Sequence, residues 1–169
     1  MGEDKLNRLP PDVKKQFLKL ALKLSEKKTK SKVHDDFLSF VKHVWPEFIE
    51  GRHHKEISEK FNQIAKGKIK RLIINMPPRH TKSEFASFLL PSWMVGRRPN
   101  LKIIQTTHTT ELAIRFGRKA KTLMDSPEYK QVFSTRLRED SQAAGKWETE
   151  QGGEYYAAGV GSAITGRGA

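Results

Sequence analysis

One stretch of the sequence, residues 71–84, constrains the fold more than any other. The apolar run over residues 72–76 predicts a buried strand, and the turn after it leads into a helix that begins near Lys82 and Ser83. At such a helix start, free backbone N–H groups and the helix dipole attract an anion. A strand, a turn and a Lys-Ser pair in this order indicate a phosphate-binding loop, in which the lysine reaches the outer phosphates and the serine hydroxyl holds Mg²⁺.

The match to the usual pattern, G-x-x-x-x-G-K-S/T, is incomplete, because Met76 and Thr81 occupy the two glycine positions. Thr81 is the more important departure, since the residue before the lysine often needs a backbone conformation that glycine adopts with the least strain. The alternative interpretation is an ordinary strand, a Pro-Pro turn and a helix whose first turn carries a Lys-Ser pair.

The charge balance of the 169-residue chain points to a polyanionic partner. It has 32 Lys and Arg against 19 Asp and Glu, a net charge of +13, and nucleic acid is the simplest such partner. A solvated, highly charged surface is the alternative. The absence of cysteine excludes disulfides and thiolate zinc sites. No apolar run approaches the ~20 residues of a membrane span, and the N-terminus lacks the apolar core of a signal peptide. We therefore expect a cytoplasmic protein without membrane contact.

Residues 1–52 are predicted to form a basic, helical N-terminal segment, followed by an incomplete P-loop ATPase domain over residues 53–169. Pro10 and Pro11 mark a helix start. Apolar residues at i, i+4, i+7 and i+11 share one face of that helix: Val13, Phe17, Leu20 and Leu24. The lysines around them are typical of an arm that faces DNA or a partner, and equally of a solvated helix.

Two further helices precede the loop. One covers residues 35–45 and ends before Pro46; the other begins near His53 and ends at Gly67. The adjacent His53 and His54 have no cysteine and no acidic residue at ligand spacing, which argues against a metal site. They are placed instead to line an adenine pocket just upstream of the phosphate loop.

Downstream of the loop, helix and strand patterns alternate. We expect a helix over residues 82–90, a buried strand over 101–107 and a helix over 110–124. With the strand at 72–76 they make a βαβ unit, which requires a parallel sheet covered by helices. The predicted fold class is therefore α/β, with a partial parallel sheet of the P-loop NTPase type flanked by helices.

The pattern changes after residue 126. Residues 126–133 predict one more helical turn, and the polar residues 136–146 a loop. Short strands are expected at 147–149 and 154–158, on either side of a glycine turn.

The glycine-rich residues 159–169 are interpreted either as a flexible tail or as a loop that faces the nucleotide with Arg167. ATPases of this type also need an apolar strand that ends in Asp or Asp-Glu and holds Mg²⁺. No acidic residue of this chain follows such a run. Ser83 is therefore the sole expected protein ligand to Mg²⁺.

Two stretches, residues 71–84 and 147–169, resemble motifs of the terminase large subunits of tailed bacteriophages, in the same order. The similarity covers residues 53–169. The family's loop is a deviant Walker A motif with an arginine ahead of the lysine, which accommodates Arg79. The resemblance implies an ATP-driven motor that translocates double-stranded viral DNA into a preformed capsid. Its P-loop ATPase domain is followed by an RNase H-like nuclease domain, which we do not expect in this chain.

By position, the resemblance assigns Lys82 to the β- and γ-phosphates of ATP and Ser83 to Mg²⁺. It assigns Arg79 to phosphate binding or to coupling between ATP and loop movement, with a structural contact to a loop carbonyl as the alternative. Arg167 is placed to reach a γ-phosphate in the same or a neighbouring subunit, or is a solvated arginine. The expected catalytic residues are Lys82, Arg79 and Arg167, and the ATP-binding loop comprises Pro78, Arg79, His80, Thr81, Lys82, Ser83 and Glu84.

The partners implied are double-stranded viral DNA, the terminase small subunit and the portal protein of the capsid. A homo-oligomeric ring is implied for the full-length protein, in the host cytoplasm. Because the acidic strand is not found, we expect the chain to bind ATP and Mg²⁺ without efficient hydrolysis. Two other functions fit the same residues: a basic DNA-binding module whose loop holds DNA phosphate, and a helicase-like P-loop ATPase of another pathway.

Overall fold

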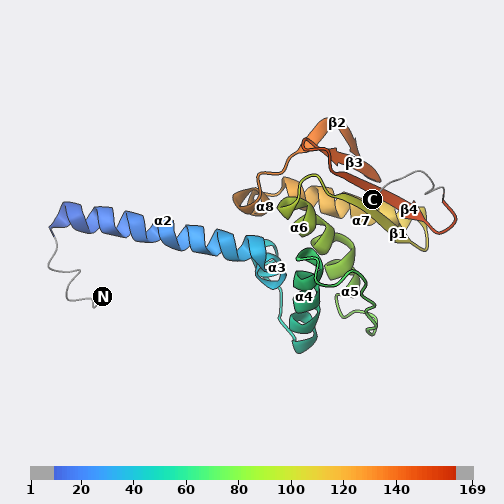
Figure 1. Ribbon diagram of the computed structural model, residues 1–169, viewed down its shortest axis with the longest axis horizontal. Helices are drawn as coiled ribbons and strands as arrows, with labels where there is room; N and C mark the ends of the chain where they lie inside the picture. The colour runs from blue at the N-terminus through green and yellow to red at the C-terminus, as the bar shows by residue number, and fades with distance from the viewer. Residues whose placement is uncertain (1–9, 163–169) are drawn as a thin grey trace.

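The computed structural model describes residues 10–162, which form a mixed α/β fold with helices flanking a four-stranded sheet (Figure 1). In the described part of the chain, three helices precede the loop: α2 (Pro11–Asp35), α3 (Phe37–Val44) and α4 (Arg52–Ala65). After it come α5 (Lys82–Glu84), the π-helix η1 (Phe85–Leu89), α6 (Leu90–Arg97), β1 (Lys102–Thr107), α7 (Thr110–Asp125), α8 (Pro127–Val132), β2 (Leu137–Ala143), β3 (Lys146–Thr149) and β4 (Glu154–Gly159).

The sheet is mixed. Its strand order is β1-β4-β3-β2, in which β1 and β4 are parallel and the other two pairs are antiparallel. A parallel pair needs a long crossover, and here the chain passes through α7, α8 and the β2–β3 hairpin. Helix α7 packs against both parallel strands. From the neighbouring strand β3, the indole N–H of Trp147 also donates to the carbonyl of Gly117 in α7 at 3.3 Å. The strand and helix predicted at 101–107 and 110–124 are confirmed as β1 and α7.

The strand predicted at residues 72–76 is not formed. Residues 71–77 adopt no regular secondary structure, and no backbone hydrogen bond joins them to another described residue. Their burial still alternates as in a strand, since Ile73 is 86% exposed whereas Leu72 and Ile74 are partly buried. A strand needs a neighbour, and β1 pairs with β4 rather than with this stretch. The predicted βαβ unit through residues 72–76 is therefore wrong.

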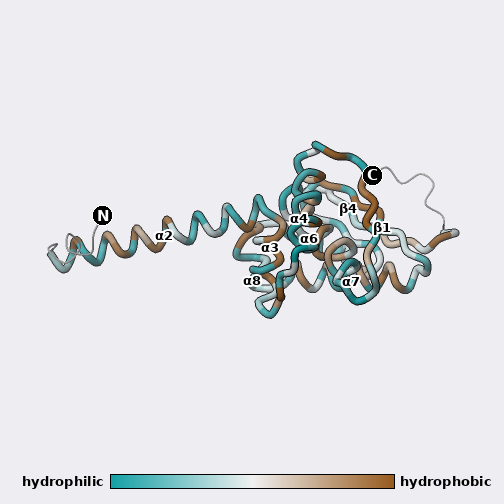
Figure 2. The backbone as a smooth tube through the Cα atoms, turned by 90° about the horizontal axis from the view of Figure 1, so that it is seen from below, coloured by the Kyte–Doolittle hydropathy of each residue, from teal (hydrophilic) through white to brown (hydrophobic). Residues whose placement is uncertain are grey.

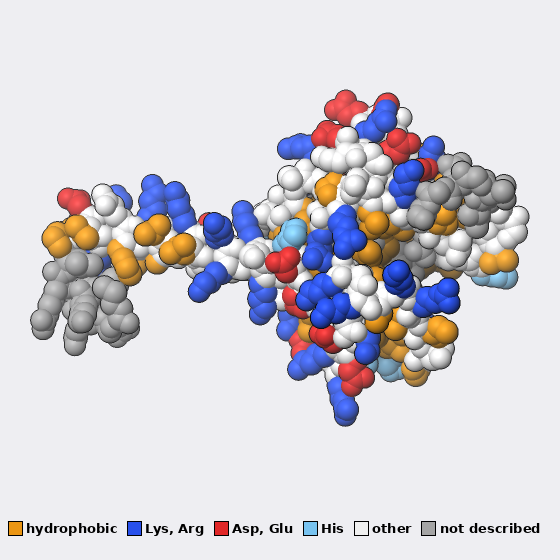
Figure 3. Space-filling model, viewed as in Figure 1, with side chains coloured by type: hydrophobic (Ala, Val, Ile, Leu, Met, Phe, Trp, Pro, Cys, Tyr) orange, Lys and Arg blue, Asp and Glu red, His pale blue; other side chains and the backbone are white. Residues whose placement is uncertain are grey.

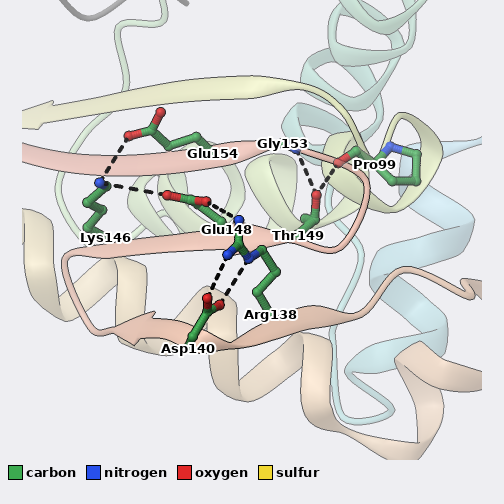
Figure 4. Close-up of polar contacts among 8 residues, drawn as sticks. All are labelled: Pro99, Arg138, Asp140, Lys146, Glu148, Thr149, Gly153 and Glu154. Atoms are coloured by element: carbon green, nitrogen blue, oxygen red, sulfur yellow. Dashed lines mark hydrogen bonds and ion pairs between the residues drawn. The ribbon is translucent and has the colours of Figure 1, made fainter.

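A polar hairpin lies where a loop is expected at residues 136–146. Strand β2 pairs with β3 in an irregular antiparallel register. Its charged side chains form a network (Figure 4), in which Arg138 donates to Asp140 at 2.6 and 2.9 Å and to Glu148 at 3.2 Å. An edge strand of charged residues has no apolar alternation to reveal it, which is why the loop prediction is wrong. The strands expected on either side of the glycine turn are confirmed as β3 and β4.

An aromatic cluster at the centre of the core joins the N-terminal helices to the segment after the loop. Phe37 of α3 is fully buried. Its ring meets three others edge to face at centroid distances of 5.1 to 5.5 Å: Phe61 of α4, Phe85 of η1 and Trp93 of α6. Rings in this geometry attract one another beyond the burial of their area. The cluster therefore holds together the helices on both sides of the loop.

A buried polar contact fixes α3 on α4. The side chain of Asn62 accepts from the backbone N–H of Phe37 at 2.9 Å and donates to the carboxylate of Asp36 at 2.8 Å. Asp36 caps α3 by accepting from the N–H of Ser39 at 2.8 Å. Burial alone would raise the pKa of Asp36, but its hydrogen bonds with Ser39 and Asn62 lower it. Helix α4, which carries His54 toward the loop, is thereby held in position.

Helix α2 stands apart from the core as a long arm (Figure 1). It begins at Pro11 as predicted, and Val33 near its C-terminal end is buried. Its predicted apolar face is not packed, because Val13, Phe17, Leu20 and Leu24 are 39% to 57% exposed. Figure 2 shows hydrophilic and hydrophobic residues alternating along the arm, and Figure 3 shows lysine and apolar side chains together on its surface. Over residues 10–162, no helix has the length and apolar character needed to cross a membrane.

Candidate phosphate-binding site

The loop at residues 77–82 leads directly into a continuous helical stretch. Helices α5, η1 and α6 follow one another without a break, and the helix continues past Pro91. The middle of this stretch is a π-turn, in which the N–H of Leu90 donates to the carbonyl of Phe85. Phe85 and Leu89 are buried in the core. The helix predicted after the loop is confirmed, and its buried side chains fix where the loop ends.

Two residues of the loop have left-handed backbone conformations. The φ angle is 63° at Arg79 and 59° at Thr81, a region in which a residue with a Cβ is strained by about 1–3 kcal/mol. The amides of residues 79–81 donate to no backbone carbonyl in the described part of the chain. Successive N–H groups in such a turn, at the start of a helix, form a concave site for an anion. Thr81 thus has the backbone form that glycine would adopt at this position.

A buried histidine contacts this strained residue. Nε2 of His54 lies 2.7 Å from Oγ1 of Thr81, and Nδ1 of His54 accepts from the backbone N–H of Gly51 at 2.8 Å. Because Nδ1 accepts, the proton of the neutral imidazole is on Nε2, which therefore donates to Thr81. The threonine hydroxyl in turn donates to the carbonyl of His80 at 2.6 Å. This series of hydrogen bonds links the start of α4 to the loop.

The surroundings of His54 favour its neutral form. The residue is 6% exposed, and its ring contacts those of Phe48 at 4.7 Å and Phe85 at 5.1 Å. Burial lowers the pKa of His54, and the neighbouring His53 and His80 lower it further, against an opposing effect of a nearby glutamate. Within residues 10–162, no group of three or more His, Asp or Glu side chains is arranged to hold a metal ion.

Lys82 and Ser83 lie where the helix begins. The ammonium of Lys82 donates to the carbonyl of Met76 at 3.3 Å, across the mouth of the loop. Ser83 is exposed, so its hydroxyl is accessible to a ligand. The carboxylate of Glu84 points elsewhere and pairs with Lys119 of α7 at 2.9 and 3.0 Å. At the helix start, the partly buried Lys82 is therefore bonded to the loop backbone and the exposed Ser83 is open to solvent. Glu84 links α5 to α7 through its ion pair with Lys119.

Of the other predicted site residues, three lie on the loop and Arg167 lies outside the described part of the chain. Pro78, Arg79 and His80 are exposed on the loop, and Nδ1 of His80 lies 2.9 Å from the carbonyl of Pro78. Arg79 is exposed and has a left-handed backbone. Its assignment to phosphate stays a prediction, as does the alternative contact to a loop carbonyl. Most of the glycine-rich stretch, like Arg167, lies outside the described residues.

A groove of about 380 Å³ runs between α4 and the unpaired stretch before the loop. Its walls include His53 and Ile57 from α4 and Leu72, Ile74 and Met76 from the opposite side. Its lining also includes the polar side chains of Glu56, Lys60 and Asn75. The groove ends beside the loop, because Met76 also accepts the hydrogen bond from the loop lysine. Its size and lining suit a flat apolar group next to an anion.

Comparison of the chain with protein-family models, with curated proteins and with solved structures finds no significant match.

Sequence reasoning missed the contact between His54 and Thr81. Both residues attract attention in the sequence, one as part of a histidine pair and the other as a replacement for glycine. Twenty-seven positions separate them, and no local pattern connects them. Their contact depends on how α4 packs beside the loop.

Proposed function

We propose that this chain is the N-terminal ATPase portion of a tailed-phage terminase large subunit, which binds ATP and Mg²⁺ to drive double-stranded viral DNA into a capsid. The observation that carries the proposal is the loop itself. Three features of the loop support a phosphate-binding role: left-handed residues at positions 79 and 81, amides without backbone partners among the described residues, and a lysine at the helix start. The motif resemblance over residues 71–84 and 147–169 supplies the class of motor.

The residues have separate roles in this proposal. Lys82 exchanges the carbonyl of Met76 for the β- and γ-phosphates, since a charged oxygen is the stronger partner for an ammonium. The loop amides donate to phosphate oxygens, and Arg79 reaches phosphate from its exposed position. The base of the nucleotide occupies the groove beside His53.

Ser83 is the residue that would hold Mg²⁺, which would neutralise charge on the phosphates. Its exposed hydroxyl fits this ion, because Mg²⁺ takes few protein ligands and keeps water and phosphate oxygens around it. Among residues 10–162, no apolar strand ends in the Asp or Asp-Glu that completes such sites. We therefore propose ATP binding without efficient hydrolysis. The viral DNA, the small subunit, the portal, the ring and the host cytoplasm remain proposals that depend on the resemblance.

A second candidate function is a basic DNA-binding module whose loop holds a DNA phosphate. The net charge of +13 and the lysine-rich arm in Figure 3 favour it. Binding that falls steeply with salt and does not respond to ATP would identify this function.

The test of the proposed function is a titration of the protein with a fluorescent ATP analogue in the presence of Mg²⁺. Lys82→Ala should weaken binding about 10- to 100-fold, because hydrogen bonds to charged groups contribute roughly 1.5–3 kcal/mol. Lys19→Ala, at an exposed lysine of the arm, removes the same charge far from the loop and should leave affinity unchanged. Equal affinity in Lys82→Ala and the unmodified protein would refute the phosphate-site assignment.

A further inference from the structure

We infer that His54 is a positioning residue, which holds Thr81 in the left-handed conformation that a phosphate loop otherwise obtains from glycine. The inference rests on the proposed function of the loop and identifies the group on which its shape depends. His54 acts through Thr81 and does not need to touch the nucleotide.

The need for such a residue follows from Thr81 itself. Its φ of 59° lies in a region that few residues other than glycine adopt, and a β-branched side chain is disfavoured there. A strained residue keeps its conformation only when the surrounding structure imposes it. The carbonyl of Thr81 accepts from the N–H of Phe85 at 2.9 Å, whereas its amide has no backbone partner among the described residues. The hydrogen bonds of the Thr81 side chain therefore constrain the side of the residue that the helix leaves unbonded.

The hydrogen bonds around Thr81 have only one consistent direction. Gly51 donates to Nδ1 of His54, Nε2 of His54 donates to the hydroxyl of Thr81, and that hydroxyl donates to the carbonyl of His80. Each donor and acceptor is used once, and the imidazole is neutral in a single tautomer. Burial also lowers the pKa of His54, which agrees with this assignment.

The imidazole is itself held firmly. It belongs to the first turn of α4 and is packed against Phe48 and Phe85. Phe85 lies in the helical stretch that follows the loop. The same histidine therefore contacts Thr81 within the loop and Phe85 just after it. The other two histidines near the loop are placed differently: His53 lines the groove, and His80 is exposed on the loop.

The test is a double-mutant cycle with His54→Ala, Thr81→Gly and the double variant, measured by ATP-analogue binding. His54→Ala should weaken binding about tenfold, because strain of this kind is of that order. In the Thr81→Gly background, where the loop no longer needs a side-chain constraint, His54→Ala should have little effect. His54→Gln, which keeps a donor for Thr81, should retain most of the affinity. An equal loss in the threonine and glycine backgrounds would overturn the inference, since it would mark a general structural role.

The same cycle is also measured in urea unfolding without nucleotide. Removing His54 should destabilise the threonine protein more than the glycine protein, and equal effects would again overturn the inference. If the unmodified protein binds no ATP analogue while the unfolding cycle shows coupling, the proposed function fails and the role of His54 stands.

Discussion

Replacing Phe37 with alanine tests whether the aromatic cluster holds the helices on both sides of the loop. The side chain is fully buried and meets three rings edge to face. Deleting a buried phenylalanine ring costs about 3–5 kcal/mol, from lost burial and from the cavity left behind. Each edge-to-face contact adds about 0.5–1.5 kcal/mol beyond burial, which places this substitution near the upper end, at about 4–5 kcal/mol.

The assay is urea unfolding followed by far-ultraviolet circular dichroism. With a slope of about 2 kcal/mol per molar urea for a domain of this size, the midpoint of Phe37→Ala should fall by about 2 M. Phe17→Ala is the matched control, because the same atoms are removed from the exposed arm, where Phe17 is 39% exposed. It should change the free energy of unfolding by less than about 0.5 kcal/mol.

Two results would refute this reasoning: a loss below about 1 kcal/mol for Phe37→Ala, or equal losses for the two variants. If Phe37→Ala does not fold, Phe37→Leu keeps the position apolar and should show a smaller loss of the same sign, still larger than that of Phe17→Ala.

Two further predictions concern pH and packing. Because the pKa of His54 is lowered from its usual 6.5 in the folded protein, its contribution to stability is complete above about pH 6.5 and is lost as pH falls through the folded-state pKa. The free energy of unfolding should therefore fall more between pH 8 and pH 5 in the unmodified protein than in His54→Gln; parallel pH curves would contradict this. Gly117→Ala should destabilise the protein by about 1–3 kcal/mol, because the new Cβ would lie 2.7 Å from the ring of Tyr155 and closer still to the carbonyl of Ala144. Thermal unfolding measures the effect, and an unchanged or higher midpoint would show that α7 does not pack this tightly on the sheet.

Helices were the part of this fold that local sequence predicted well. The residues that produce the apolar periodicity of a helix, and those that start the helix, are close to one another in the sequence. Asp36, Thr109 and Ser126 each cap the helix that follows by accepting a backbone N–H three residues on. Such contacts are formed within one segment, so the sequence around them contains the information.

The strands were predicted less well, because a strand is defined by its partner. Residues 72–76 have the apolar pattern of a buried strand but no strand beside them, whereas the charged β2 has no such pattern and is paired with β3. An apolar pattern therefore does not guarantee that a segment pairs in a sheet, and a segment can pair without such a pattern.

The candidate site likewise has features that the local sequence determines and features that depend on the tertiary structure. By itself the sequence determined the residue types and their spacing: a lysine and a serine at a helix start, and a threonine at a glycine position. Only the tertiary structure decided that Thr81 is left-handed, that His54 contacts it and that Glu84 pairs with Lys119. The physical reason is distance along the chain, because hydrogen bonds between residues 27 and 35 positions apart form only when packing brings their helices together.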